Sequence, residues 1–328
     1  MDVTDFPSVV VRASSRISPH VRRTPVDRAR WLERRIGARV FLKQENLQAT
    51  GSFKLRGATN RVLAAAEERP GAEVVAASTG NHGAGVALAC RRAGLPCRVF
   101  VPEGASPGKL EAIRDLGAEL VTAGDDGVIA ERSARRYAEE NGLTYVSPYN
   151  DPVVIAGQGT VGAELAEQCE DLDAVFISLG GGGLLSGVAG FLCALNPSIE
   201  VVACSARLSS VMYQSLRRGE VVDVPSDPTL SDGTAGGVEA GAITLPLCRD
   251  LIDRHELVSE DEIARALSDL IERQHILVEG AAALALAGLV RSGERYRDAR
   301  VAVILCGANI TAETLGRALA RAAGARST

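Results

Sequence analysis

The sequence lacks the features that mark several common classes of protein. Its seven cysteines form no Cys-x-x-Cys pair, and we expect most of them to be buried apolar side chains in a reducing compartment. Its four histidines include no His-Glu-x-x-His spacing. No apolar run reaches membrane-spanning length without interruption, and the acidic N-terminus lacks the apolar core of a signal peptide. We therefore expect a cytoplasmic protein that binds neither a metal nor a membrane.

The sequence also lacks an excess of positive charge. Its 36 basic and 41 acidic residues give a net charge of -5, so no nucleic-acid partner is expected. Hydrophobic residues make up 46% and charged residues 23% of the chain, a balance typical of folded globular proteins. With 328 residues, the chain is long enough to form two subdomains.

Short β-branched runs alternate with helical stretches along the chain. The expected strands are 40–43, 74–77, 97–101, 119–122, 144–146, 174–178, 201–205 and 301–305, and the expected helices are 55–68, 82–93, 107–116, 127–140, 155–170, 184–195, 260–274, 281–290 and 312–322. This alternation predicts an α/β fold built from three-layer α/β/α domains with parallel or mixed sheets. We expect residues 73–150 to form a small mobile domain and residues 1–72 and 151–328 to form a larger, discontinuous one.

The segment Ser52–Ala58 places a lysine just inside an expected helix start. Lys54 follows a turn at Gly51 and lies between Phe53 and Leu55, so its surroundings can be apolar. Burial lowers the pKa of a lysine and frees its amine to attack an aldehyde. A lysine at a helix start is more often a solvated cation, so this assignment depends on the motifs that follow.

Four consecutive glycines, Gly180–Gly183, precede an expected helix that starts at Leu184. Without Cβ atoms, their N–H groups can surround a phosphate at the positive end of the helix dipole. Close packing of the helix against a strand is the other explanation, but four glycines exceed what we expect packing to need. The run does not match the dinucleotide-binding fingerprint, which makes a nicotinamide dehydrogenase the weakest alternative.

Two further segments carry polar groups at the ends of expected strands. Ser78–Gly83 is typical of a turn that offers hydroxyl and amide groups to a carboxylate. In it, Asn81 can donate to a phenolate oxygen on a pyridine ring, although Asn81 and His82 also fit ordinary helix capping. Cys306 follows the strand 301–305 and is either a core side chain or a weak donor to a pyridine nitrogen. A weak donor at that place favours β-elimination over a long-lived carbanion.

Together these motifs resemble the fold-type-II pyridoxal-phosphate enzymes of the threonine/serine dehydratase and serine racemase family. The resemblance extends from about Ile17 to Ala322. It is carried by Lys43–Gln48, Gly51–Ala58, Ser78–His82, Val154–Thr160, Gly180–Gly183, Val278–Ala281 and Leu305–Asn309. The resemblance implies a fold similar to that of the tryptophan synthase β subunit, with pyridoxal 5′-phosphate in the cleft between the two domains. It also implies a homodimer.

The resemblance assigns roles to individual residues. Lys54 would be the catalytic lysine that bonds to the cofactor, and Thr79 a second catalytic group. The remaining cofactor contacts would be Phe53 beside the ring, Asn81 at the ring hydroxyl, Gly180, Gly181, Gly182, Gly183 and Leu184 at the phosphate, and Cys306 at the ring nitrogen. Ser52, Ser78, Thr79, Gly80 and His82 would hold the substrate. The implied activity removes water and ammonia from a β-hydroxy α-amino acid such as threonine or serine, with the freed amine of Lys54 taking the α-proton.

Two positions depart from the racemases of this family. Thr79 stands where those racemases carry a serine that acts as the opposite acid/base, and its extra methyl group crowds the site. Racemisation is therefore disfavoured, and it remains an alternative. The segment Cys204–Val211 lacks the carboxylates with which those racemases bind a divalent cation, so we expect no metal there.

Other activities and substrates also remain alternatives. Thr229–Glu239 resembles the dehydratases assigned to hydroxyectoine breakdown, so the substrate could be a specialised hydroxy amino acid, derived from hydroxyectoine or equal to 3-hydroxyaspartate. Cysteine-synthase-type β-replacement is less favoured, because that branch follows its lysine with Asp-Arg and here Leu55–Gly57 follow. A non-catalytic protein that binds another phosphate ester is the alternative from a different class. About twenty residues follow Asn309, too few for the regulatory domain of biosynthetic threonine dehydratases, so no such domain is expected.

Overall fold

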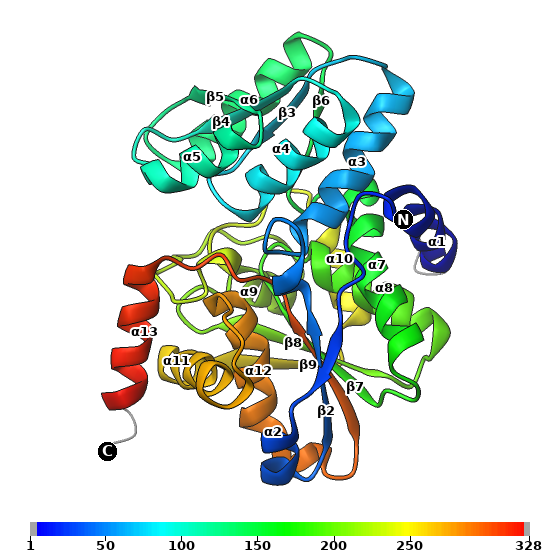
Figure 1. The fold of residues 1–328 in the computed structure, drawn as a ribbon, viewed down its shortest axis with the longest axis vertical. Coiled ribbons are helices and arrows are strands. Elements are labelled where there is room, and N and C mark those ends of the chain that lie inside the picture. The colour runs from blue at the N-terminus through cyan, green and yellow to red at the C-terminus, as the bar shows by residue number, and fades with distance from the viewer. Residues whose placement is uncertain (1–4, 325–328) are drawn as a thin grey trace.

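The structure is a computed structural model and describes residues 5–324. It contains two sheets, and Figure 1 shows the smaller one above the larger. The larger sheet has the strand order β1-β2-β10-β7-β8-β9, and the smaller one has the order β5-β4-β3-β6. This arrangement confirms the α/β fold class with mixed and parallel sheets.

The larger sheet is parallel except for its first strand. Its strands are β1 (Val26–Arg28), β2 (Arg39–Gln44), β7 (Ala174–Ser178), β8 (Glu200–Ala206), β9 (Arg254–Val258) and β10 (Arg300–Leu305). Only β1 runs antiparallel, against β2. The central strand β7 is buried at every position, as expected for a parallel strand with helices on both faces.

Two groups of helices cover the two faces of this sheet, as Figure 1 shows. One group comprises α1 (Phe6–Ile17), α7 (Pro152–Gln168), α8 (Gly183–Leu195), α9 (Val211–Arg218) and α10 (Thr244–Leu251). The other comprises α2 (Arg30–Ile36), α11 (Glu260–Asp269), α12 (Gly280–Ser292) and α13 (Ala312–Gly324). The short elements η2 (Glu45–Leu47), η3 (Asp232–Thr234), η4 (Leu270–Gln274) and η5 (Gly293–Tyr296) connect them.

The smaller sheet is parallel throughout. Its strands are β3 (Val74–Ala77), β4 (Cys97–Val101), β5 (Glu119–Thr122) and β6 (Thr144–Tyr145), and its helices are α4 (Asn81–Ala93), α5 (Pro107–Asp115) and α6 (Gly127–Glu140). Helix α3 (Lys54–Glu68) packs Ala58, Val62 and Ala65 into the core of this sheet, and Val154 of α7 joins them. The smaller unit therefore draws core residues from outside 73–150, and its exact boundaries stay a prediction.

All eight expected strands occur, with ends that differ by at most two residues. The sequence analysis did not predict β1, β9 or the helices α1, α2, α9 and α10. Among the helices of residues 5–324, none is both long and apolar enough to cross a membrane.

Candidate active site

A cavity of about 900 Å³ lies where the two sheets meet. Its walls include residues that follow the carboxyl ends of β3, β7 and β10, the place where parallel α/β sheets bind ligands. The predicted site residues that line it are Phe53, Lys54, Ser78, Thr79, Gly80, Asn81, His82, Gly180, Gly181, Gly182, Gly183, Leu184 and Cys306. The structure therefore gathers nearly all of the predicted site in one cavity.

Lys54 is the first residue of α3, and two hydrogen-bonded loops place it beside Cys306. Strands β2 and β10 are parallel neighbours, so the segments that follow them leave the sheet at the same edge. There Ser52 forms an isolated bridge with Gly307, and the N–H of Phe53 donates to the carbonyl oxygen of Cys306 at 3.0 Å. The amine of Lys54 donates to the carbonyl oxygen of Pro148 at 2.8 Å.

Burial controls the charge of the amine and of the thiol. It lowers the pKa of Lys54 from 10.5 to about 8, against the attraction of Cys306 and Glu279. It also raises the pKa of the Cys306 thiol well above its ordinary value, an effect that the nearby carboxylate of Glu279 reinforces. The amine thus reaches its nucleophilic form closer to neutral pH, while the thiol keeps its proton.

The glycine run Gly180–Gly183 is packed against protein at every position. A Cβ added to Gly181 would lie 2.4 Å from Cδ1 of Tyr149, and one added to Gly182, whose φ is +87°, would lie 2.8 Å from Sγ of Cys248. At Gly180 and Gly183 an added Cβ would come within 2.9 Å of Thr234 and Tyr149. Packing alone therefore accounts for all four glycines, contrary to the expectation from the sequence.

The backbone N–H groups of the same loop still form an anion site. Ser186 is the first residue of α8 whose N–H reaches a carbonyl oxygen, that of Gly182 at 2.8 Å. Within residues 5–324, the N–H groups from Gly180 to Leu185 have no protein acceptor. Free donors at the start of a buried helix are suited to a phosphate.

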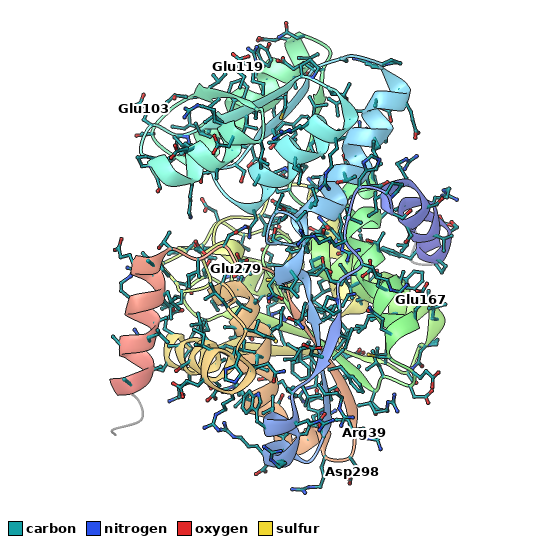
Figure 2. All side chains as sticks on the ribbon, in the orientation of Figure 1. Arg39, Glu103, Glu119, Glu167, Glu279 and Asp298 are labelled. Carbon is teal, nitrogen blue, oxygen red and sulfur yellow. The ribbon has the colours of Figure 1, made fainter. Side chains whose placement is uncertain are left out.

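Asn81 starts α4 and forms hydrogen bonds with Glu279. The sequence analysis gave Glu279 no role. Nδ2 of Asn81 donates to both oxygens of Glu279, at 3.1 and 2.9 Å. Glu279 precedes α12, yet its carboxylate does not cap that helix. In Figure 2 it lies in the middle of the molecule, where the two sheets meet. Burial raises its pKa to about 7, while the hydrogen bond from Asn81 lowers it.

Asn309 forms hydrogen bonds with both Asn81 and Glu279. Its Nδ2 donates to Oδ1 of Asn81 at 2.6 Å and to the carbonyl oxygen of Thr50 at 2.8 Å, and its backbone N–H donates to Glu279 at 3.2 Å. These contacts join residues that are 198 and 228 positions apart in the chain. The sequence analysis included Glu279 and Asn309 in two of the segments that carry the family resemblance, Val278–Ala281 and Leu305–Asn309, but gave neither residue a role.

The other predicted substrate contacts differ in how far they face the cavity. Thr79 and Gly80 lie in the turn before α4, and Ser78 Oγ accepts from the N–H of Gly80 at 3.1 Å. The ring of His82 is buried, with Nε2 2.8 Å from the carbonyl oxygen of Val146, and burial lowers its pKa to about 3. Ser52 is fully buried outside the cavity wall, where its Oγ accepts from the N–H of Lys54 at 3.4 Å.

A buried ionic cluster lies behind the first turn of α3. The guanidinium of Arg56 is fully buried and donates to both oxygens of Glu45, at 2.8 Å each. It also donates to Glu164 at 2.6 and 2.9 Å, and the amine of Lys43 donates to the same carboxylate at 2.6 Å. The cluster connects α3 to β2 and α7 through Arg56, which lies two residues after Lys54.

No group of three or more metal-binding side chains occurs in the part of the chain that the structure describes. The expectation of no metal stays a prediction.

Comparison with known proteins identifies the family of this chain. The sequence profile of the pyridoxal-phosphate-dependent enzymes matches residues 17–307. This chain belongs to that family. In this pyridoxal-phosphate-dependent enzyme, the residues of the cavity fit the cofactor: free N–H groups suit its phosphate, an amine of lowered pKa suits its aldehyde, and a protonated thiol suits its ring nitrogen.

Within this family, the chain is similar to several individual proteins and solved structures. The enzyme is 41% identical to an L-threonine ammonia-lyase from Thermotoga maritima over 75% of its own chain, but that match spans only 61% of the relative's length. The structure of threonine deaminase isoform 2 from Solanum lycopersicum aligns with a TM-score of 0.91 and 32% identity, covering 98% of this chain and 94% of that one. Maize serine racemase aligns with a TM-score of 0.89 and 31% identity, covering 98% of both chains.

Proposed function

We propose that this enzyme eliminates water from a β-hydroxy α-amino acid such as threonine or serine, and that hydrolysis of the product then gives a 2-keto acid and ammonia. The observation that carries the proposal is one cavity that brings together the amine of Lys54, the free N–H groups at the start of α8 and the Ser78–Asn81 turn. The likeness to L-threonine ammonia-lyase and to threonine deaminase supports the same reaction.

Each group has a role in this proposal. Pyridoxal phosphate, when bound, supplies an aldehyde that condenses with an amino group and a ring that withdraws electrons from the α-carbon. The N–H groups of Gly180–Leu184 hold its phosphate, and Phe53 lies beside the ring. Asn81 donates to the ring hydroxyl, and Cys306 faces the ring nitrogen without giving up its proton.

Lys54 performs the proton transfer. With the cofactor bound, the amine of Lys54 would hold its aldehyde, and the amino group of the substrate would free Lys54 by taking its place. The free amine of Lys54 then takes the α-proton, for which a pKa of about 8 is well matched. The β-hydroxyl would take a proton from the cofactor phosphate or from a water beside it and leave as water. Addition of water to the resulting imine then releases ammonia and the 2-keto acid. The Ser78–His82 turn, with Ser52 beneath it, orients the substrate so that the α-proton faces Lys54.

The test is release of keto acid from L-threonine, L-serine, threo-3-hydroxyaspartate and hydroxylated diaminobutyrate. Lys54→Ala is the control, because it keeps the cavity and removes the amine. Turnover of one substrate that is lost in the variant supports the proposal and begins to define the side chain that the cavity accepts. A cofactor-loaded protein that is inert with all four overturns it.

Racemisation on the same scaffold is the second candidate. Two observations favour it. Thr79 lies in the cavity wall, where its hydroxyl can serve as a second acid/base, and the overall fold is similar to that of maize serine racemase. Chiral analysis of the recovered substrate separates the two reactions.

The arrangement of the two sheets supports a mobile smaller domain. We propose that residues 73–150 move against residues 1–72 and 151–328 when substrate binds. Two ion pairs cross from this domain to the segment after α9: Lys109 with Asp232 at 3.6 Å, and Arg135 with Glu239 at 2.7 Å. Their side chains are between 21% and 57% exposed, and partly exposed pairs contribute little stability, so they can open during the motion.

A homodimer in the cytoplasm is proposed on two further observations. Leu47 and Leu277 are 44% and 49% exposed and lie close together, since Nδ2 of Asn46 donates to the carbonyl oxygen of Leu277. Neighbouring exposed leucines are typical of an interface. All seven cysteines are free thiols, as in a reducing compartment. Sedimentation of the purified protein measures its oligomeric state.

A further inference from the structure

Asn309 lies at the junction of the two sheets and holds the amide of Asn81. Asn81 starts α4, which follows β3 of the smaller sheet, whereas Glu279 precedes α12 and Asn309 follows β10 of the larger sheet. Asn309 donates from Nδ2 to Asn81 and from its backbone N–H to Glu279, while Asn81 donates to Glu279. The three residues therefore form a closed ring of hydrogen bonds.

The chemistry of the ring permits one orientation of each amide. An ionised carboxylate only accepts hydrogen bonds, so the NH₂ group of Asn81 must face Glu279. Its Oδ1 then faces Asn309, which must present its own NH₂ group. The carbonyl oxygen of Thr50 is a second acceptor beside that NH₂ group and fixes the same orientation.

Two neighbouring loops fix the place of Asn309. A Cβ added to Gly51, whose φ is +72°, would lie 2.7 Å from Oδ1 of Asn309. The N–H of Ala308 donates to the carbonyl oxygen of Gly51 at 2.8 Å. The loop before Lys54 and the loop after Cys306 therefore fix the place of Asn309, while its exposed side chain keeps its orientation through the hydrogen bonds to Asn81 and Thr50.

The orientation matters because the NH₂ group of Asn81 has two hydrogens. The two oxygens of Glu279 belong to one carboxylate and lie on one side of this group, which leaves the second hydrogen for another acceptor in the cavity. If the amide were reversed, its oxygen would face that acceptor, and an oxygen repels a phenolate. We propose that Asn309 is a positioning residue that, with Glu279, turns the N–H donor of Asn81 toward the ring hydroxyl of the cofactor. The inference rests on the proposed function, in which Asn81 faces that hydroxyl.

The test compares the binding of two cofactors. Pyridoxal phosphate carries the ring hydroxyl, and 3-deoxypyridoxal phosphate lacks it. Each is titrated into the full chain after removal of bound cofactor, at a pH above the pKa of Glu279, and the dissociation constant is measured by isothermal titration calorimetry. Asn309→Asp removes the side-chain donor, and Asn309→Ser keeps one hydroxyl donor.

We expect Asn309→Asp to weaken the binding of pyridoxal phosphate by about tenfold or more, the loss expected for one hydrogen bond to a charged group. Its binding of the 3-deoxy compound should change far less, and Asn309→Ser should lie between wild type and Asn309→Asp. Asn141→Asp is the matched control, because Asn141 lies at the exposed end of α6 outside the cavity wall. Equal losses for both cofactors, or no loss for either, would overturn the proposal.

Glu279→Gln gives an independent check that keeps the shape of the side chain. A carboxamide can donate or accept, so residue 279 no longer restricts the amide of Asn81, and only the NH₂ group of Asn309 still does. The same selective loss for pyridoxal phosphate is expected, and an unselective loss contradicts the proposal. A wild-type protein that binds pyridoxal phosphate but releases no keto acid from any substrate would overturn the proposed function while leaving this comparison of binding intact.

Discussion

The amine of Lys54 lies 2.8 Å from the carbonyl oxygen of Pro148, in the connection between β6 and α7. The next residue, Tyr149, packs its ring against Gly181, and its hydroxyl accepts from the N–H of Glu239 at 2.8 Å. One short segment therefore contacts the amine, the glycine loop and the segment after α9. The amine is held in place by a neutral acceptor, so its charge depends on burial rather than on a bound carboxylate.

The first prediction concerns stability and pH. The pKa of Lys54 is about 8 in the folded protein against 10.5 for a free lysine, so the folded state binds fewer protons between these values and stability rises with pH there. Below the lower value the wild type carries the full cost of a buried charge. Without cofactor, Lys54→Met should be more stable than wild type at neutral pH by roughly 1–3 kcal/mol.

Urea denaturation of both proteins across this pH range checks the prediction. The advantage of Lys54→Met should shrink as the pH rises through the window from about 8 to 10.5, because the wild-type amine loses its proton there. A difference in stability that stays constant with pH would show that the folded-state pKa is not lowered.

The second prediction concerns Cys306. Burial keeps its thiol protonated, and its Sγ lies 3.9 Å from Oε1 of Glu279. Cys306→Ser keeps a neutral donor, so the rate of keto-acid release should stay within about tenfold of wild type. Cys306→Asp brings a carboxyl group that can protonate the ring nitrogen, so elimination should slow and the α-hydrogen should exchange more often with solvent. Mass spectrometry of substrate recovered from D₂O measures the exchange, and fast elimination without exchange in Cys306→Asp would contradict this role.

The third prediction concerns Thr79. Thr79 lies in the cavity wall and carries both a hydroxyl and a methyl group. Thr79→Ser removes only the methyl group and should increase the fraction of D-amino acid in recovered L-substrate. Thr79→Ala should abolish that fraction and leave keto-acid release measurable. Chiral chromatography gives both values, and an equal D-fraction in the two variants would exclude Thr79 as a proton carrier.

The strands that could be predicted from sequence are those buried between helices. β3 is a continuous apolar run, and β4, β7 and β10 contain one polar residue each, because helices cover both faces of these strands. The two missed strands, β1 and β9, lie at the two edges of the larger sheet and carry charged residues such as Asp27 and Arg254. Edge strands face solvent on one side and often carry charge, so their sequences lack the apolar pattern from which a strand is predicted.

The residues of the site also differ in how well the sequence alone predicts them. Lys54, the glycine run and the Ser78–His82 turn are each recognisable from a few consecutive residues. The contacts of Glu279 with Asn81 and of Asn309 with Asn81 join the two sheets across most of the chain, and no local pattern encodes them. The local sequence around Glu279 fits an ordinary helix start, and only the fold shows that its carboxylate faces the cavity instead.

The fourth prediction concerns the ionic cluster behind α3. Glu45 and Arg56 are both fully buried, so Glu45→Ala leaves the guanidinium of Arg56 without one of its two carboxylate partners. Removing one member of a buried pair costs about 3–5 kcal/mol, whereas an exposed pair contributes about 0–1 kcal/mol. Glu67→Ala is the matched control, because Glu67 pairs with Arg16 and its side chain is 64% exposed. Urea denaturation should therefore show a large loss of stability for Glu45→Ala and almost none for Glu67→Ala. Similar losses for the two variants would mean that water or Glu164 compensates Arg56, and that the cluster does not anchor the helix that begins at Lys54.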